Sequence, residues 1–129
     1  MQQSENNNEP REYVEFVFYR VPKKNHKKLV ILTKRLIEFI KKEEVSYKSF
    51  SLIGTANIPG FSNISKVISI NPGEEEIWIN MVTYKNRKHR TKVIEKISTD
   101  KECLDIYEEL MQLLIPGTGF INGEFRSVV

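Results

Sequence analysis

Polar and aromatic side chains recur along the segments that alternate like β-strands, and their types suit the binding of a small organic molecule. A ligand pocket is usually walled by apolar and aromatic groups, with a few polar groups that fix the ligand's orientation. The residues of this kind that could share one pocket are Tyr13, Glu15, Tyr47, Trp78, Asn80, Tyr84 and Arg126. We take them as candidate ligand-binding residues, although the same set is also typical of an ordinary sheet face or a dimer seam.

The common catalytic and metal-binding motifs are absent from the sequence. It contains no glycine-rich phosphate loop, no Cys-x-x-Cys, no His-x-x-x-His and no Gly-x-Ser-x-Gly. The two imidazoles, His26 and His89, each lie in a lysine-rich helix start, where a solvated or capping role is expected. No catalytic residue, metal site or cofactor is therefore assigned, and enzymatic activity stays open.

Basic residues gather directly after Tyr84. The cluster comprises Lys85, Arg87, Lys88, Arg90 and Lys92, and Lys23, Lys24, Lys27 and Lys28 could extend it into a phosphate-attracting edge. The net charge is only +3, however, and no exposed aromatic residues are expected to interleave with the cluster. Nucleic acid is therefore not favoured as a partner.

Hydrophobic periodicity divides the 129 residues into strands and helices. Strands are predicted at residues 13–21, 45–53, 76–84 and 120–129, and residues 66–70 are expected to be extended and to form a hairpin with 76–84. Helices are predicted at 25–44, from Asn86 to 97, and at 101–114, where Pro116, Gly117 and Gly119 end the last one. Residues 55–65 are a predicted loop, residues 1–10 a disordered tail, and residues 11–129 a single domain.

Two of the predicted helices carry apolar stripes that should face a core. The first stripe comprises Leu29, Leu32, Thr33, Leu36 and Ile40, and the last comprises Leu104, Tyr107, Leu110, Met111 and Leu114. The lone Cys103 lies in the last helix between acidic neighbours, so we expect a buried structural side chain rather than a reactive thiol.

The first strand is apolar on both faces. Val14, Phe16 and Phe18 share one face, and Tyr13, Glu15, Val17 and Tyr19 share the other. The order strand, helix, strand pair, helix, strand predicts an α+β fold, a ferredoxin-like βαββαβ sandwich with both helices on one face of an antiparallel sheet. Because the second face also needs a cover, we predict a homodimer that closes a dimeric α/β barrel.

Nothing in the sequence predicts a membrane or an export signal. The longest aliphatic run covers residues 29–32, whereas about 18 apolar residues are needed to cross a bilayer. The N-terminus has no basic segment followed by an apolar one, and one cysteine cannot form an internal disulfide. A cytoplasmic location is therefore expected.

Several short motifs match one known family in type and order. They are Tyr13-Val14-Glu15, Val21-Pro22, Glu75-Glu76 before a strand that closes at Tyr84, Arg90 six residues further on, and Gly123-Glu124-Phe125. In these, and over nearly all of its length after the tail, the chain resembles the YbaA-like family of uncharacterised proteins in the dimeric α/β-barrel superfamily. It departs from the family at Thr91, where an acidic residue is usual, at Met81, where tryptophan is usual, and in the short segment 115–119.

The resemblance implies a fold but no activity, because the family has none established. Members of the superfamily place ligands between sheet and helices, and they include cofactor-free monooxygenases, haem-degrading enzymes and isomerases. Our first hypothesis is therefore a dimer that binds a small ligand there without an identifiable catalytic motif. The alternatives are a cofactor-independent monooxygenase, an isomerase-like enzyme or a haem-handling enzyme, and, less favoured, a nucleic-acid-binding module.

The haem alternative depends on one spacing. Trp78 and His89 resemble the tryptophan and histidine of haem-degrading relatives, which lie about as far apart in sequence. The asparagine that those relatives carry on the first strand is missing, since Asn80 belongs to another strand.

Overall fold

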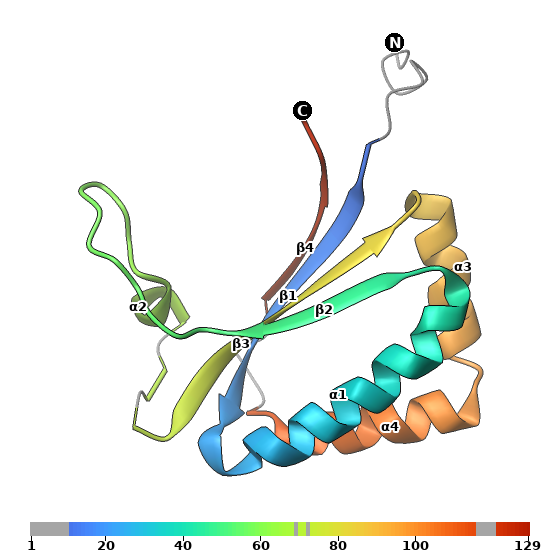
Figure 1. Ribbon diagram of the computed structural model, residues 1–129, viewed down its shortest axis with the longest axis horizontal. Helices are drawn as coiled ribbons and strands as arrows, with labels where there is room; N and C mark the ends of the chain where they lie inside the picture. The colour runs from blue at the N-terminus through green and yellow to red at the C-terminus, as the bar shows by residue number, and fades with distance from the viewer. Residues whose placement is uncertain (1–10, 69, 72, 116–120) are drawn as a thin grey trace.

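A four-stranded antiparallel sheet forms the centre of the computed structural model, which describes residues 11–68, 70–71, 73–115 and 121–129 (Figure 1). The elements are β1 (Tyr13–Pro22), α1 (His26–Ile40), β2 (Ser46–Ser51), α2 (Ile64–Ile68), β3 (Glu75–Tyr84), α3 (Arg87–Ile97), α4 (Lys101–Leu113) and β4 (Ile121–Arg126), with 3-10 turns at Lys23–Asn25 and Lys41–Glu43. The strand order is β2-β3-β1-β4. The predicted tail 1–10 and the predicted helix stop at 116–119 lie outside the described residues.

The central pair β1 and β3 sets the register of the sheet. Tyr13 lies opposite Tyr84 and Pro22 opposite Glu75, so ten residues of each strand are paired. Both strands are rich in β-branched and aromatic residues, which favour this pleated surface, and β1 ends at Pro22, which has no backbone donor. Together with the helices on one side, this is the ferredoxin-like α+β fold that the sequence predicts.

Helix α1 buries the side that its periodicity predicts. Leu29, Leu32, Thr33, Leu36 and Ile40 are all buried. The helix then passes through a 3-10 turn to Glu44, whose backbone is left-handed with φ 61°. Buried Val45 follows and turns the chain back into β2.

Helix α4 buries only part of the predicted stripe, because Leu110 is buried and Leu114 packs against the core but the other predicted residues do not face it. Cys103, Ile106 and Leu110 face the core, whereas Leu104, Tyr107 and Met111 are 43%, 53% and 37% exposed. The helical spacing was right but its phase was displaced by one residue. The small Cys103 and the branched Ile106 fill the core, and Tyr107 and Met111 are left at the rim of a cavity described below.

The predicted hairpin between residues 66–70 and β3 is wrong. Residues Ile64–Ile68 form the short helix α2, because the Asn63 backbone oxygen accepts from Lys66 and Val67 and its side chain accepts from Ser65. Strand β3 pairs with β2 on one edge and with β1 on the other, which leaves no edge for a further strand.

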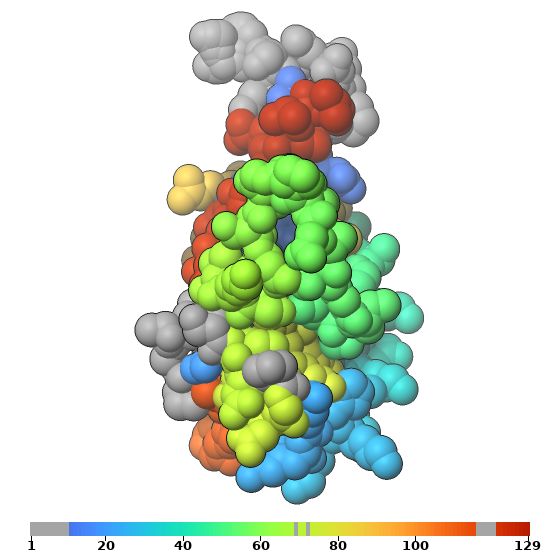
Figure 2. All heavy atoms as spheres, turned by 90° about the vertical axis from the view of Figure 1, so that its left-hand side faces the viewer, coloured from blue at the N-terminus to red at the C-terminus, as the bar shows by residue number. Residues whose placement is uncertain are grey.

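The two faces of the sheet have different cover. Helices α1, α3 and α4 lie on one side, while the loop that contains α2 projects on the other (Figure 1) and stands toward the viewer in Figure 2. The side away from α1, α3 and α4, called here the free face, carries Val14, Phe16, Phe18, Phe50, Ile79, Met81, Ile121 and Phe125. Several of these are well exposed, such as Phe50 at 48% and Phe125 at 56%.

Candidate functional site

A cavity of about 100 Å³ lies between the helices α1 and α4 and the covered face of the sheet. We call it the chamber. Its walls come from five elements and comprise Val17, Tyr19, Leu29, Thr33, Leu36, Tyr47, Asn80, Tyr107, Leu110, Met111 and Leu114. Most of these side chains are apolar, so a few polar groups decide what the chamber can recognise.

Asn80 is the centre of a hydrogen-bonded cluster at the bottom of the chamber. Its Oδ1 accepts from the Tyr19 hydroxyl at 2.7 Å and from Ser49 Oγ at 2.6 Å, and its Nδ2 donates to the Tyr47 hydroxyl at 2.7 Å. The register places Ser49 of β2 directly opposite Asn80 of β3, and Tyr47 lies two residues from Ser49 on the same face. We call these four residues the polar floor.

The polar floor is neutral at physiological pH. Burial raises the pKa of Tyr19 to about 12, although Ser49 and Asn80 oppose the shift. Burial raises the pKa of Tyr47 still further, and the neighbouring Tyr19 adds to the effect. Both phenols therefore stay protonated, so the floor offers hydrogen bonds rather than a charged acid or base.

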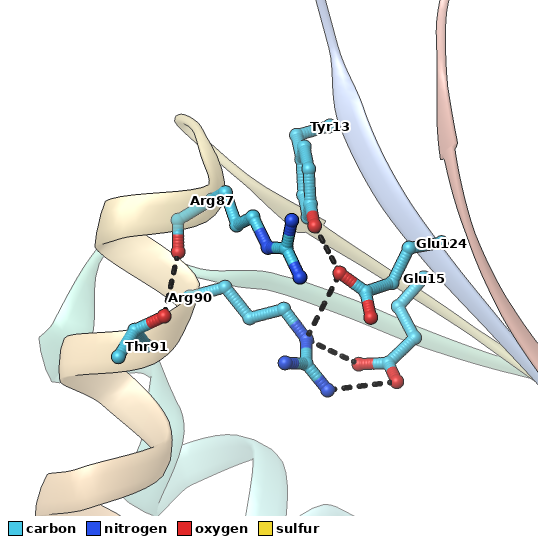
Figure 3. Close-up of polar contacts among 6 residues, drawn as sticks. All are labelled: Tyr13, Glu15, Arg87, Arg90, Thr91 and Glu124. Carbon is cyan, nitrogen blue, oxygen red and sulfur yellow. Dashed lines mark hydrogen bonds and ion pairs between the residues drawn. The ribbon is translucent and has the colours of Figure 1, made fainter.

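A second polar cluster ties α3 to the sheet at the end where β1 begins (Figure 3). Arg90 makes a bidentate ion pair with buried Glu15, from Nε to Oε1 and from Nη2 to Oε2, both at 3.1 Å. Arg90 Nε also lies 4.0 Å from Glu124 Oε1, and the Tyr13 hydroxyl donates to that same carboxylate. The hydrogen bond with Glu15 raises the pKa of Arg90 despite partial burial. These contacts connect α3 with β1 and β4.

The structure divides the seven predicted pocket residues among several places. Tyr47 and Asn80 line the chamber. Tyr13, Glu15 and Tyr84 belong to the Arg90 end, where burial and the Glu15 charge raise the pKa of Tyr84 to about 12.

Trp78 and Arg126 lie at the borders of these two groups, Trp78 beside Tyr19 with ring centroids 6.3 Å apart. Trp78 contacts His26 and Glu76 near the start of α1. Arg126, on the edge strand β4, lies opposite Tyr13 and is exposed. Of the seven residues, the structure therefore brings only Tyr47 and Asn80 to the wall of the chamber.

Sequence reasoning missed two residues of the polar floor that a stricter use of strand alternation could have found. Tyr19 lies on the same face of β1 as Glu15, and Ser49 lies on the same face of β2 as Tyr47. Thr33 was identified only as part of a buried stripe, yet its hydroxyl-bearing side chain reaches the chamber wall.

His89 has a structural role that occupies both ring nitrogens. Its Nδ1 accepts from the Lys85 backbone at 2.9 Å, and its Nε2 lies 2.8 Å from the Glu43 carbonyl oxygen. Its ring packs edge-on against Tyr84 at 5.9 Å. Trp78 lies six residues before Tyr84 on β3, about 20 Å along an extended strand. The structure therefore does not bring Trp78 and His89 together.

The predicted basic cluster is partly neutralised. Lys85 Nζ lies 2.8 Å from Glu44 Oε1, and Arg90 is held by Glu15. Arg87, Lys88 and Lys92 are exposed. Within the part of the chain that the structure describes, no three His, Cys, Asp or Glu side chains are arranged to hold a metal ion. Among the same residues, no helix has the length and apolarity to cross a bilayer.

Comparisons with known proteins find relatives of the fold only. No protein-family model matches the chain, and no curated protein sequence is similar to it. Among solved structures, the fold is similar to an N63A mutant of SnoaB, a cofactor-independent oxygenase from Streptomyces nogalater, with a TM-score of 0.54, 10% identity, and 91% of this chain and 94% of that chain covered.

A second solved structure is similar to the same extent. It is an uncharacterised NIPSNAP domain protein from Burkholderia xenovorans, with a TM-score of 0.55, 11% identity, and 91% of this chain and 93% of that chain covered. At such low identity these likenesses establish the fold and nothing about activity. They support the ferredoxin-like α+β fold described above.

Proposed function

We propose that this protein is a homodimer that binds a small, mostly apolar organic molecule in the chamber, through a carbonyl-type oxygen. The observation that carries the proposal is the polar floor, a set of neutral hydrogen-bonding groups at the bottom of an apolar enclosure. Such a combination binds a ligand by shape and fixes its orientation by a few polar contacts.

The hydrogen-bond donors of the polar floor that have no acceptor within the cluster define the group that the ligand must present. Tyr47 accepts a hydrogen bond from Asn80, so its own hydroxyl proton is available, and Asn80 has a second Nδ2 hydrogen. Both point to a ligand that accepts hydrogen bonds, such as a ketone or a quinone. No floor residue is charged, so the chamber supports binding better than the oxygenase or haem alternatives.

The size of the chamber limits what can enter. At about 100 Å³ it is smaller than an apolar cavity of about 150 Å³ that accommodates benzene. Two rim residues, Tyr107 and Met111, are partly exposed and can change rotamer, and methionine adapts readily to a neighbouring surface. We therefore expect a single ring to enter, with the rim side chains displaced.

The free face supports the homodimer. Its aromatic and aliphatic side chains form a broad apolar surface, where Phe16 and Phe125 already stack edge-on at 5.4 Å. The adjoining loop adds exposed Ile53 and Phe61, at 99% and 75%. A surface of this kind marks an interface, and a second copy offers the same apolar chemistry in the symmetric arrangement most common among oligomers.

The remaining parts of the proposal rest on the sequence. Membership of the YbaA-like family, a single domain over residues 11–129 and a cytoplasmic location are retained as hypotheses. Buried, reduced Cys103 supports the location.

A pair of matched probes tests the chamber. Acetophenone and ethylbenzene share a ring and nearly the same shape, but only acetophenone has an acceptor oxygen. We expect acetophenone to bind about fivefold more tightly, measured by amide chemical shifts, because one hydrogen bond contributes about 1 kcal/mol. Tyr47→Phe should narrow that ratio, and Ser51→Ala, outside the chamber, should leave it unchanged. Equal affinity for the two probes, or no binding, would remove the proposal.

A further inference from the structure

His26, the first residue of α1, is held by an acidic residue of β3. Its Nδ1 lies 2.8 Å from Glu76 Oε1, and the Trp78 indole N–H donates to the same oxygen at 2.8 Å. Glu76 and Trp78 lie two residues apart on one strand, so their side chains share a face. The His26 ring also packs edge-on against Trp78, with centroids 5.4 Å apart. The imidazole is therefore fixed in position and orientation.

The hydrogen bonds determine which nitrogen of His26 is available. Burial acts to raise the pKa of Glu76, but the hydrogen bonds from His26 and Trp78 and the charge of nearby Lys23 outweigh it and lower the pKa. An ionised carboxylate only accepts, so Nδ1 carries a proton, and in the neutral imidazole the lone pair is then on Nε2. No hydrogen-bond partner for Nε2 occurs among the described residues. His89, by contrast, uses both nitrogens within the fold.

His26 lines a cavity of about 320 Å³ between α1 and the edge strand β2. We call it the basin. Apolar side chains, including Val30, Ile37 and Trp78, form part of its wall, and Lys34 supplies a cation that has no ion-pair partner among the described residues. Its volume is at the lower end of the range for small-molecule sites, about 300 to 1,000 Å³. Thr33 lines both the basin and the chamber, and Ser49 of the polar floor also lines the basin, so the two cavities are neighbours.

We propose that the basin is a proton-transfer site for a small enolisable carbonyl compound that carries an apolar ring and a carboxylate, as an aromatic 2-keto acid does. The ring would lie against Trp78 and Val30, the carboxylate would pair with Lys34, and the acidic C–H would face His26 Nε2. This site uses His26, Glu76 and Lys34, none of which belongs to the polar floor. It is therefore independent of ligand binding in the chamber.

The chemical step needs no oxidant or cofactor. His26 Nε2 takes a proton from the carbon next to the carbonyl, the C–H electron pair forms the new C=C bond, and the carbonyl π pair moves to oxygen. The Glu76 carboxylate stabilises the imidazolium that results, and Trp78 holds that carboxylate in place. Return of the proton from Nε2 to the enolate oxygen completes a tautomerisation, delivery of a proton to the carbon completes a proton exchange, and either step restores neutral His26. A positioned base of this kind contributes about 10²- to 10⁴-fold in rate.

Phenylpyruvate is a suitable probe because it has the ring, the carboxylate and an acidic methylene group. Exchange of its methylene protons in D₂O, followed by NMR, should be at least about 100-fold faster with the protein than in matched buffer. His26→Gln should remove this acceleration, and the matched control His89→Gln, which alters the other histidine, should retain it. Lys34→Met should raise the half-saturating phenylpyruvate concentration with little change in the rate at saturation.

Glu76 is a positioning residue, and its role has its own readout. Glu76→Gln should lower the exchange rate at saturation without changing the half-saturating concentration, and Glu76→Asp should restore part of that rate. A purely structural role would alter both quantities together or neither.

Two outcomes would overturn the proposal: exchange at the buffer rate with the wild type, or full exchange in a folded His26→Gln variant. If that variant does not fold, the wild-type protein provides the test. Carbethoxylation of His26 must then abolish exchange, and bound phenylpyruvate must protect His26 from carbethoxylation. Acetophenone binding measured on the same samples separates this result from the chamber, because His26→Gln should not affect it.

Discussion

Replacing Arg90 with methionine should destabilise the protein more than any other substitution of a charged residue in α3. Arg90 is the only partner that the described residues give to the buried Glu15 carboxylate, through two hydrogen bonds of 3.1 Å. Methionine retains much of the side-chain volume but no donor. The Glu15 charge would then be left unpaired in the sheet, and Glu124, 4.0 Å from Arg90 Nε, would lose the same cation.

The expected loss in unfolding free energy is about 2 kcal/mol. Breaking a fully buried ion pair from one side costs about 3 to 5 kcal/mol. Here the Arg90 side chain is 25% exposed, so water can partly solvate the Glu15 carboxylate that is left. A loss of about 2 kcal/mol, below the range for a fully buried pair, is therefore appropriate. For a chain of this length, about 2 kcal/mol corresponds to a Tm about 8 °C lower.

Urea unfolding at one fixed protein concentration measures this effect, because the stability of a dimer depends on concentration. Lys92→Met is the matched control: Lys92 is exposed on the same helix, and its replacement should change stability by less than about 0.5 kcal/mol. In a double-mutant cycle, Glu15→Gln and Arg90→Met should show a coupling of at least about 1 kcal/mol. Additivity within about 0.5 kcal/mol would refute a direct interaction.

Three further predictions concern the free face, Cys103 and the buried phenols. Phe16→Asp should convert a dimer of twice the 15.1 kDa chain mass into a monomer in light scattering, whereas Ile31→Asp on exposed α1 surface should not; a monomeric wild type would contradict the homodimer. Cys103 should resist a thiol reagent until the protein unfolds, because burial and then the Asp100 charge raise its pKa; rapid labelling of the native protein would contradict its burial. Since burial raises the pKa of Tyr19 to about 12 from about 10 in an unfolded chain, the native state holds this proton more tightly, so its contribution to stability is complete below about pH 10 and declines as the pH rises toward 12. Tyr19→Phe should make the unfolding free energy, measured by urea unfolding between pH 9 and 12, fall less steeply with pH. An unchanged pH dependence would show that other groups cause the decline.

The sequence predicts the fold well because its strongest patterns are local. Alternation in β1 and the 3.6-residue period of α1 identify both elements, including every buried residue of the α1 stripe. The capping residues are also local, and Asn86 and Asp100 accept from the third residue beyond them, as their types suggest.

The errors arise where tertiary packing decides between local alternatives. Residues 64–70 contain isoleucine and valine, which favour strands, but β3 already has a neighbour on each edge and Asn63 can start a helical turn. In α4, two apolar stripes lie one residue apart, and periodicity alone cannot choose between them. The small Cys103 decides the matter, because it allows the helix to approach the core.

The sites were harder to predict because they depend on register between distant segments. His26 and His89 look alike in the sequence, each among lysines at the start of a helix. What separates them is the acceptor that each meets: β3 places Glu76 beside His26, 50 residues away in sequence, and the turn after α1 places the Glu43 carbonyl beside His89. One imidazole therefore keeps a free nitrogen that faces a cavity, and the other uses both nitrogens to hold the fold together. Whether a histidine can accept a proton thus depends on whether its second ring nitrogen already has a hydrogen-bond partner. Only the folded structure shows this, because the partners come from segments distant in sequence.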